Sequence, residues 1–69
     1  MGVFVAYVVS DDGEISITGV YLTREKAEAA LIDDFEHIWE DEGRPDSIEK
    51  LNELWDWEAV VAESELYNS

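Results

Sequence analysis

The chain begins with a β-hairpin pattern, which limits the folds open to it more than any other feature. Residues 3–9 read VFVAYVV, a run of β-branched and aromatic residues that is apolar on both faces. Such a run is typical of a central strand with at least one covered side. Residues 10–13 read SDDG, which predicts a tight turn because Asp-Gly tolerates the positive φ that hairpins require. An antiparallel hairpin therefore starts the fold.

The second strand of the hairpin is predicted over residues 14–22, EISITGVYL. Its two isoleucines fall on one face and alternate with polar residues. Gly19 interrupts this alternation, and Val20 and Leu22 would otherwise change face. We therefore expect a β-bulge at Gly19.

A long helix is predicted to follow the hairpin, with Thr23 as its N-cap and Gly43 at its end. The outward side of this helix, over residues 24–42, carries the carboxylates Asp33, Glu36 and Glu40. The inward side carries apolar residues at helical spacing, namely Ala27, Ala30, Leu31, Phe35, Ile38 and Trp39.

A second helix and a closing strand are predicted after Pro45, which prevents the first helix from continuing. Asp46 is predicted to cap this helix, with Glu49 three residues later as in a capping box. Residues 57–67, WEAVVAESELY, indicate a strand, although residues 58–66 are also compatible with an extension of the helix. The apolar stripe of the second helix consists of Ile48, Leu51, Leu54 and Trp55.

These elements predict one α+β domain over residues 1–69, in the order β-β-α-α-β. Two helices pack on one face of a small antiparallel sheet, formed by the N-terminal hairpin and the C-terminal strand. The chain has no cysteine, so its core depends on packing alone. A hydrophobic content of 46% argues against disorder. We expect Trp39 and Trp55 in the core and Trp57 partly exposed.

The net charge of the chain is its most unusual property. Eighteen Asp and Glu against four Lys and Arg give a charge of −14. This sign argues against direct binding to nucleic acid or to an anionic membrane. It favours a basic partner, a cation or a high-salt environment. No stretch approaches the roughly 18 apolar residues of a membrane span, and no secretory signal is recognisable. We therefore expect a cytoplasmic protein without a membrane partner.

Residue patterns for catalysis are weak, and we expect neither an enzyme nor a cofactor. The one histidine, His37, lies among carboxylates, and no Gly-rich elbow surrounds a serine. Asp33, His37 and Asp41 have the spacing i, i+4, i+8, which on a helix would align them for weak binding of a divalent ion. A solvated polar edge accounts for the same spacing, so we predict no metal site.

The carboxylates are concentrated in residues 33–58, which hold eleven acids and two bases, a net charge of −9 (2 − 11). If these residues were all helical, they would span about 39 Å at about 1.5 Å per residue. That gives one net charge per about 4 Å, close to the spacing of about 3.4 Å along one DNA strand. The predicted partner-binding residues are Asp33, Glu36, Glu40 and Asp41 at the centre, with Asp34, Glu49, Glu53 and Asp56.

A small, cysteine-free domain with extreme acidity on its helices resembles the phage-encoded DNA-mimic inhibitors of the anti-CRISPR and anti-restriction type. The resemblance implies an inhibitor that binds the basic surface of a CRISPR effector subunit or restriction enzyme in the host cytoplasm and blocks its binding of target DNA. Separately, residues 7–31, YVVSDDGEISITGVYLTREKAEAAL, resemble small uncharacterised bacterial and phage proteins with a hairpin followed by a helix. This second resemblance supports the fold.

Two other functions remain open at this point. One is an ordinary protein of a halophile, although such a protein should spread its charge evenly, whereas residues 1–23 hold only three acids. The other is an antitoxin or adaptor module that binds a different basic protein. The oligomeric state, monomer or dimer, is also open.

Overall fold

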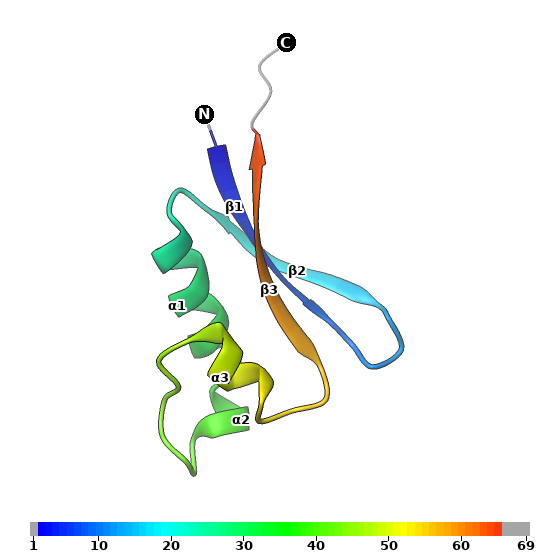
Figure 1. Ribbon diagram of the computed structural model, residues 1–69, viewed down its shortest axis with the longest axis vertical. Helices are drawn as coiled ribbons and strands as arrows, with labels where there is room; N and C mark the ends of the chain where they lie inside the picture. The colour runs from blue at the N-terminus through cyan, green and yellow to red at the C-terminus, as the bar shows by residue number, and fades with distance from the viewer. Residues whose placement is uncertain (1, 66–69) are drawn as a thin grey trace.

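The computed structural model describes residues 2–65 of the chain. Its sheet has three antiparallel strands in the order β2-β1-β3, and the helical segments follow the hairpin (Figure 1). The α+β class and the order β-β-α-α-β are confirmed, although the helices are short and the first is divided in two. The elements are β1 (Gly2–Val9), β2 (Ile15–Tyr21), α1 (Arg24–Asp34), α2 (Glu36–Trp39), α3 (Ile48–Asn52) and β3 (Glu58–Glu65).

The hairpin turn forms where the SDDG sequence predicts it. The backbone N–H of Gly13 donates to the carbonyl of Ser10 at 2.9 Å, and Ser10 N–H donates to the carbonyl of Glu14 at 2.9 Å. Gly13 has φ 87°, a left-handed conformation that glycine adopts without steric cost. The turn chemistry therefore sets the antiparallel pairing of β1 and β2.

The predicted β-bulge is confirmed. Ala6 pairs with Gly19 and Tyr7 with Ile17, so Thr18 is an extra residue on β2. The Thr18 hydroxyl donates to the carbonyl of Ala6 at 3.1 Å. The extra residue keeps the apolar side chains on either side of the bulge on the same face of the sheet.

The closing segment is a strand and not an extension of the second helix. β3 pairs with β1 along its whole length, from Gly2 opposite Glu65 to Val9 opposite Glu58. β1 is therefore the central strand, as its continuous apolar run predicts. Residues 66 and 67 of the predicted strand lie outside the described residues.

The core lies between the helices and one face of the sheet. β1 contributes Ala6 and Val8, and β3 contributes Ala59. Figure 1 shows the three helices gathered on one side of the twisted strands. No helix in residues 2–65 is long and apolar enough to cross a bilayer. The buried helical partners in the core are Ala27, Leu31, Ile32, Trp39 and Leu51.

The start of α1 agrees with the sequence, but its end does not. Thr23 caps the helix by accepting from the backbone N–H of Lys26 at 3.2 Å. The single helix predicted over residues 24–42 is wrong, because α1 ends at Asp34 and Phe35 leaves helical geometry at φ −114°, ψ 36°. Carboxylates crowd the last turn of α1, which has no basic residue, and this opposes the helix dipole.

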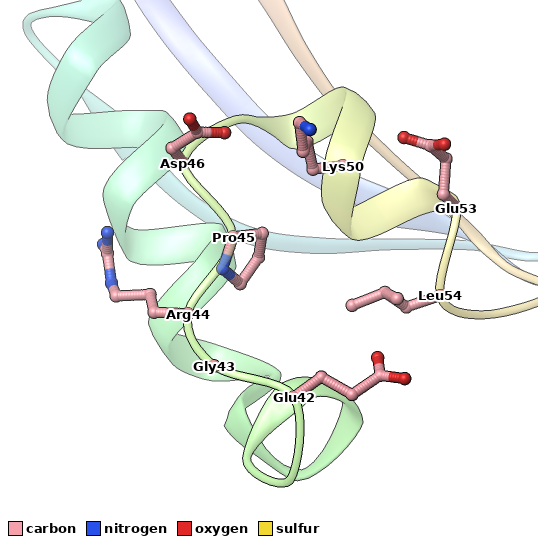
Figure 2. Close-up of a pocket in the computed structure, with 8 residues that line it drawn as sticks. All are labelled: Glu42, Gly43, Arg44, Pro45, Asp46, Lys50, Glu53 and Leu54. Atoms are coloured by element: carbon pink, nitrogen blue, oxygen red, sulfur yellow. The ribbon is translucent and has the colours of Figure 1, made fainter.

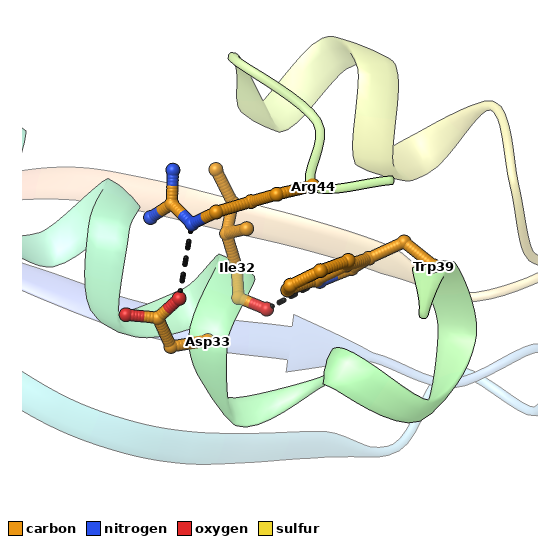
Figure 3. A network of polar contacts seen from close by, with 4 residues as sticks. All are labelled: Ile32, Asp33, Trp39 and Arg44. Carbon is orange, nitrogen blue, oxygen red and sulfur yellow. Dashed lines mark hydrogen bonds and ion pairs between the residues drawn. The ribbon is translucent and has the colours of Figure 1, made fainter. Parts of the chain in front are cut away.

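Trp39 holds the end of α1 in place. Its indole N–H donates to the carbonyl of Ile32 at 2.8 Å, beside the Arg44–Asp33 pair (Figure 3). In a continuous helix this carbonyl would accept from residue 36, four positions later. The folded-back indole takes the place of residue 36, and the Phe35 N–H donates to the same carbonyl at 3.3 Å, so this acceptor has two partners where the chain turns.

We predict that Trp39→Phe lowers the free energy of unfolding by about 1–2 kcal/mol, because it removes a buried hydrogen bond while retaining most of the packing. Urea denaturation followed by far-UV circular dichroism measures the change without depending on tryptophan fluorescence. Trp57→Phe is the matched control, since Trp57 is 40% exposed and should change stability by less than about 0.5 kcal/mol. Equal effects of the two substitutions would contradict the role given to Trp39.

The second helix is shorter than predicted and starts at a different cap. Ser47, not Asp46, is the N-cap of α3, because its hydroxyl accepts from the backbone N–H of Lys50 at 3.2 Å. The helix ends at Asn52, so Leu54 and Trp55 lie in the following loop and not on a helical stripe. Asp and Ser are about equally good N-caps, so the local sequence does not distinguish Asp46 from Ser47 as the start of the helix.

The Asn52 side chain explains why α3 ends where it does. Its amide nitrogen donates to the carbonyl of Ala59 at 3.0 Å, and its amide oxygen accepts from the Ala59 N–H at 2.7 Å. The same oxygen accepts from the indole N–H of Trp55 at 3.2 Å. Asn52 thus joins the helix, the loop and the first residues of β3, and it occupies backbone groups on an otherwise open strand edge.

Candidate partner-binding surface

The acidic lobe, which we define as residues 33–58, contains most of the charge of the chain. It includes the end of α1, then α2, α3 and their connecting loops, in the lower part of Figure 1. All eleven carboxylates of the lobe are exposed. They are carried by loops and short helices, so the lobe is a charged surface and not a charged rod.

Few of these charges are neutralised within the molecule. Arg44 pairs with Asp33 at 3.1 Å (Figure 3), and this is the one ion pair that residues 2–65 form. Both side chains are about half exposed, so the pair contributes at most about 1 kcal/mol to stability. Arg24 is held at the other end of α1, with its guanidinium 5.2 Å from the centre of the Phe4 ring. The remaining carboxylates of the lobe are therefore free to attract cations.

The eight predicted binding residues are all exposed, but they do not form two continuous helical stripes. Of the 26 residues in the lobe, eleven are helical: two in α1, four in α2 and five in α3. The linear, phosphate-like spacing expected from continuous helices is therefore wrong. α1 holds Asp33 and Asp34, α2 holds Glu36, α3 holds Glu49, and the caps and loops hold Glu40, Asp41, Glu53 and Asp56.

A first pocket of about 470 Å³ lies between α3 and the loop that precedes it (Figure 2). Its carboxylates come from Glu42, Asp46 and Glu53, and Lys50 lies at its edge. Figure 2 shows Arg44 pointing away from this pocket toward α1. Glu53 is the only predicted site residue here; the sequence predicts Asp46 as a helix cap, and Glu42 is not among the predicted binding residues.

A second pocket of about 420 Å³ is aromatic and lies on the same lobe. Phe35 and Trp55 have ring centres 4.8 Å apart, and those of Trp55 and Trp57 are 5.9 Å apart. Ile38, His37 and Asp56 complete its lining. Aromatic faces close to carboxylates attract ammonium and guanidinium groups. The sequence pattern assigns Phe35 and Trp55 to core stripes and therefore does not predict this pocket; the WDW triplet at residues 55–57 is the available signal.

Glu49 lines a third, smaller pocket of about 290 Å³, which contains none of the other predicted binding residues. This pocket lies where α1, α3 and β3 meet, and it is lined by Arg24, Glu28, Glu49 and Glu58 among others. The predicted residues therefore divide among several surfaces. Asp33, Asp34, Glu36, Glu40 and Asp41 line none of the three pockets.

Asp33, His37 and Asp41 do not lie on one helix in the structure, so their i, i+4, i+8 spacing does not align them. The break at Phe35 places Asp33 in α1, His37 in α2 and Asp41 in a turn, so no single helix aligns them. Within residues 2–65, no group of three His, Cys, Asp or Glu side chains is arranged to hold a metal ion.

Comparison with known proteins assigns the chain to a family but finds no individual relative. Neither a curated protein nor a solved structure matches the chain. A family model matches residues 1–58 and is described as "Domain of unknown function (DUF7336)".

Proposed function

This chain belongs to the DUF7336 family, and from the surface of the chain itself we propose that it is a small acidic inhibitor. It binds the cationic, nucleic-acid-binding surface of another protein and thereby prevents that surface from binding nucleic acid. A bacterial defence complex, such as a CRISPR effector or a restriction enzyme, is the target class that we place first. Such a target places the inhibitor in the cytoplasm.

The observation that carries this proposal is the unneutralised charge of the acidic lobe. Eleven exposed carboxylates and two bases give it a net charge of −9, and one ion pair forms within residues 2–65. Keeping like charges this close together opposes compact folding. A cationic partner that faced the lobe would relieve this repulsion and release the counterions of both surfaces, which is the main term in nucleic-acid binding as well.

The aromatic pocket supports a protein partner over a diffuse cloud of small ions. Charge alone steers association but adds little specificity, whereas a desolvated aromatic site can anchor one side chain. An Arg or Lys of the partner would place its cation over Trp55 or Trp57, with Asp56 beside it. In this arrangement the pocket selects the position at which the acidic lobe docks.

The test is capture of partners from a bacterial lysate on the immobilised full-length chain. The salt concentration is kept at about 0.05 M, because the Debye length there exceeds the roughly 10 Å of 0.1 M salt and charge attraction is screened less. We expect the captured proteins to be nucleic-acid-binding proteins and to be released by a DNA duplex. Because counterion release dominates, we expect release to be complete by about 0.5 M salt. Trp57→Ala should weaken capture about tenfold, since an anchoring aromatic contributes more than about 1 kcal/mol.

Two results would count against the proposal. One is the absence of any captured nucleic-acid-binding protein at low salt. The other is capture that a DNA duplex does not reverse, which would indicate a basic partner of another kind. Cooperative unfolding of the free chain at low salt, with recovery only in molar KCl, would instead support adaptation to a saline cytoplasm.

A further inference from the structure

The face of the sheet that points away from the helices is apolar and uncovered. Alternate residues of a strand face opposite sides, and Ala6 and Val8 of β1 face the helices. The remaining side chains of the three strands therefore form a second surface, which we call the open face. Its apolar members are Val3, Val5, Tyr7, Val9, Ile15, Ile17, Val20, Val60 and Ala62.

The exposed part of this face lies on the edge strand β2, whereas the β1 and β3 members are partly buried and Val3 is only 9% exposed. Ile15, Ile17 and Val20 are 62%, 68% and 59% exposed, and Leu22, just beyond β2, is 68% exposed. The apolar side chains are in cross-strand rows, such as Ile17, Tyr7 and Val60, and are not scattered singly. A contiguous apolar patch of this kind marks an interaction surface in a protein that is otherwise highly charged.

We propose that the open face is the interface of a homodimer, in which two copies of this chain pack sheet against sheet. This inference is independent of the proposed function, because it uses a different face of the molecule. Two identical sheets rich in β-branched side chains can interdigitate about a twofold axis, with the sheets about 10 Å apart. The helical layers then lie outside, so both acidic lobes remain accessible.

Charge argues for a second copy as the occupant. Glu58 is the one carboxylate that strand alternation places on the open face within residues 2–65, and no cation lies on these strands. A largely apolar face with a single carboxylate at one end is complementary to another such face and offers little to a basic partner. Face-to-face packing also places the two lobes of net charge −9 on opposite sides of the dimer, where their mutual repulsion is smallest.

The size of the face is sufficient for a weak, reversible dimer. Three strands about 4.8 Å apart and seven residues long, at about 3.3 Å per residue, cover about 330 Å² in projection. Two such faces total about 660 Å² in projection (2 × 330), below the roughly 1,000 Å² of a stable specific interface, so the dimer is expected to be weak and concentration-dependent.

Sedimentation velocity on the full chain tests the dimer, over concentrations from about 10 to about 500 μM. We expect the mass to rise from 7.9 kDa toward 15.8 kDa (2 × 7.9). The dissociation constant should fall as salt is raised from about 0.05 to about 0.5 M, because salt screens the repulsion between two chains of charge −14. Binding to a basic partner has the opposite salt dependence, so the two proposals fail separately.

Ile17→Lys should raise the dissociation constant more than tenfold, because it places two unpaired charges in an apolar interface. Ser16→Lys is the matched control, since the neighbouring exposed residue faces the other side of the same strand; it should leave the dimer intact. If Ile17→Lys does not fold, Val20→Thr, which keeps the β-branched shape, should weaken the dimer. A mass of 7.9 kDa at every concentration and salt, or a dimer unaffected by both Ile17→Lys and Val20→Thr, would overturn the proposal.

Discussion

Neutralising Asp34, Glu36, Glu40 and Asp41 together is expected to weaken binding to a basic partner about 100-fold at low salt while leaving the fold intact. Each exposed charge pair contributes up to about 1 kcal/mol, so four pairs can amount to about 2–4 kcal/mol. All four carboxylates are exposed, and the one ion pair of residues 2–65 involves none of them. Asp33 is left unchanged, because it pairs with Arg44.

The measurement is the dissociation constant of the captured partner for the variant Asp34→Asn, Glu36→Gln, Glu40→Gln and Asp41→Asn. The control variant carries Asp11→Asn, Asp12→Asn, Glu14→Gln and Glu63→Gln, four exposed acids outside the lobe. Both variants have a net charge of −10 (−14 + 4). Long-range attraction is therefore matched, and equal losses of affinity would show that total charge and not the lobe determines binding.

Leu31→Ala is expected to remove a large fraction of the stability of the domain at 25 °C. Leu31 is fully buried in α1, the helix that contacts all three strands. Truncating such a leucine costs about 2–5 kcal/mol, because it removes apolar burial and leaves a cavity. A domain of 69 residues has a total stability of only about 3–10 kcal/mol. The loss is therefore a large fraction of the whole.

Thermal unfolding and urea titration by far-UV circular dichroism measure this effect, at a fixed protein concentration because a dimer would add to apparent stability. Leu54→Ala is the matched control, since Leu54 is 37% exposed in the loop after α3. We expect it to cost less than about 1 kcal/mol. A Leu31→Ala variant as stable as the control would mean that the helices contribute little to holding the sheet together.

The two proposals assign different physical roles to the two layers of the molecule. The helical layer carries the acidic lobe and the aromatic pocket, and its interactions weaken as salt is added. The sheet carries the open face, and its interactions strengthen as salt is added, because only repulsion is screened. A dimer would display two acidic lobes at once, which increases avidity for a target with two cationic sites at a suitable distance.

Several features of this protein were determined by the sequence alone, because they depend on neighbours within a few residues. The SDDG turn, the bulge at Gly19 and the cap at Thr23 each follow from one residue and its immediate backbone. The central position of β1 follows from its unbroken apolar run. The acidity of residues 33–58 was also evident from the sequence, and so was its concentration there.

Other features were decided only by the tertiary structure. Helical periodicity continues through Phe35, yet the chain breaks there, because the Trp39 indole folds back onto Ile32 and replaces a helical hydrogen bond. Asn52 ends α3 by bonding to Ala59 at the start of β3, a contact with the next element that the helical pattern does not encode. The alternation of β2 showed that its isoleucines share a face but not which face the helices cover. The covered face is the one on which α1 packs. The isoleucines of β2 therefore remain exposed to solvent, and the acidic lobe lies on the opposite, helical side of the sheet.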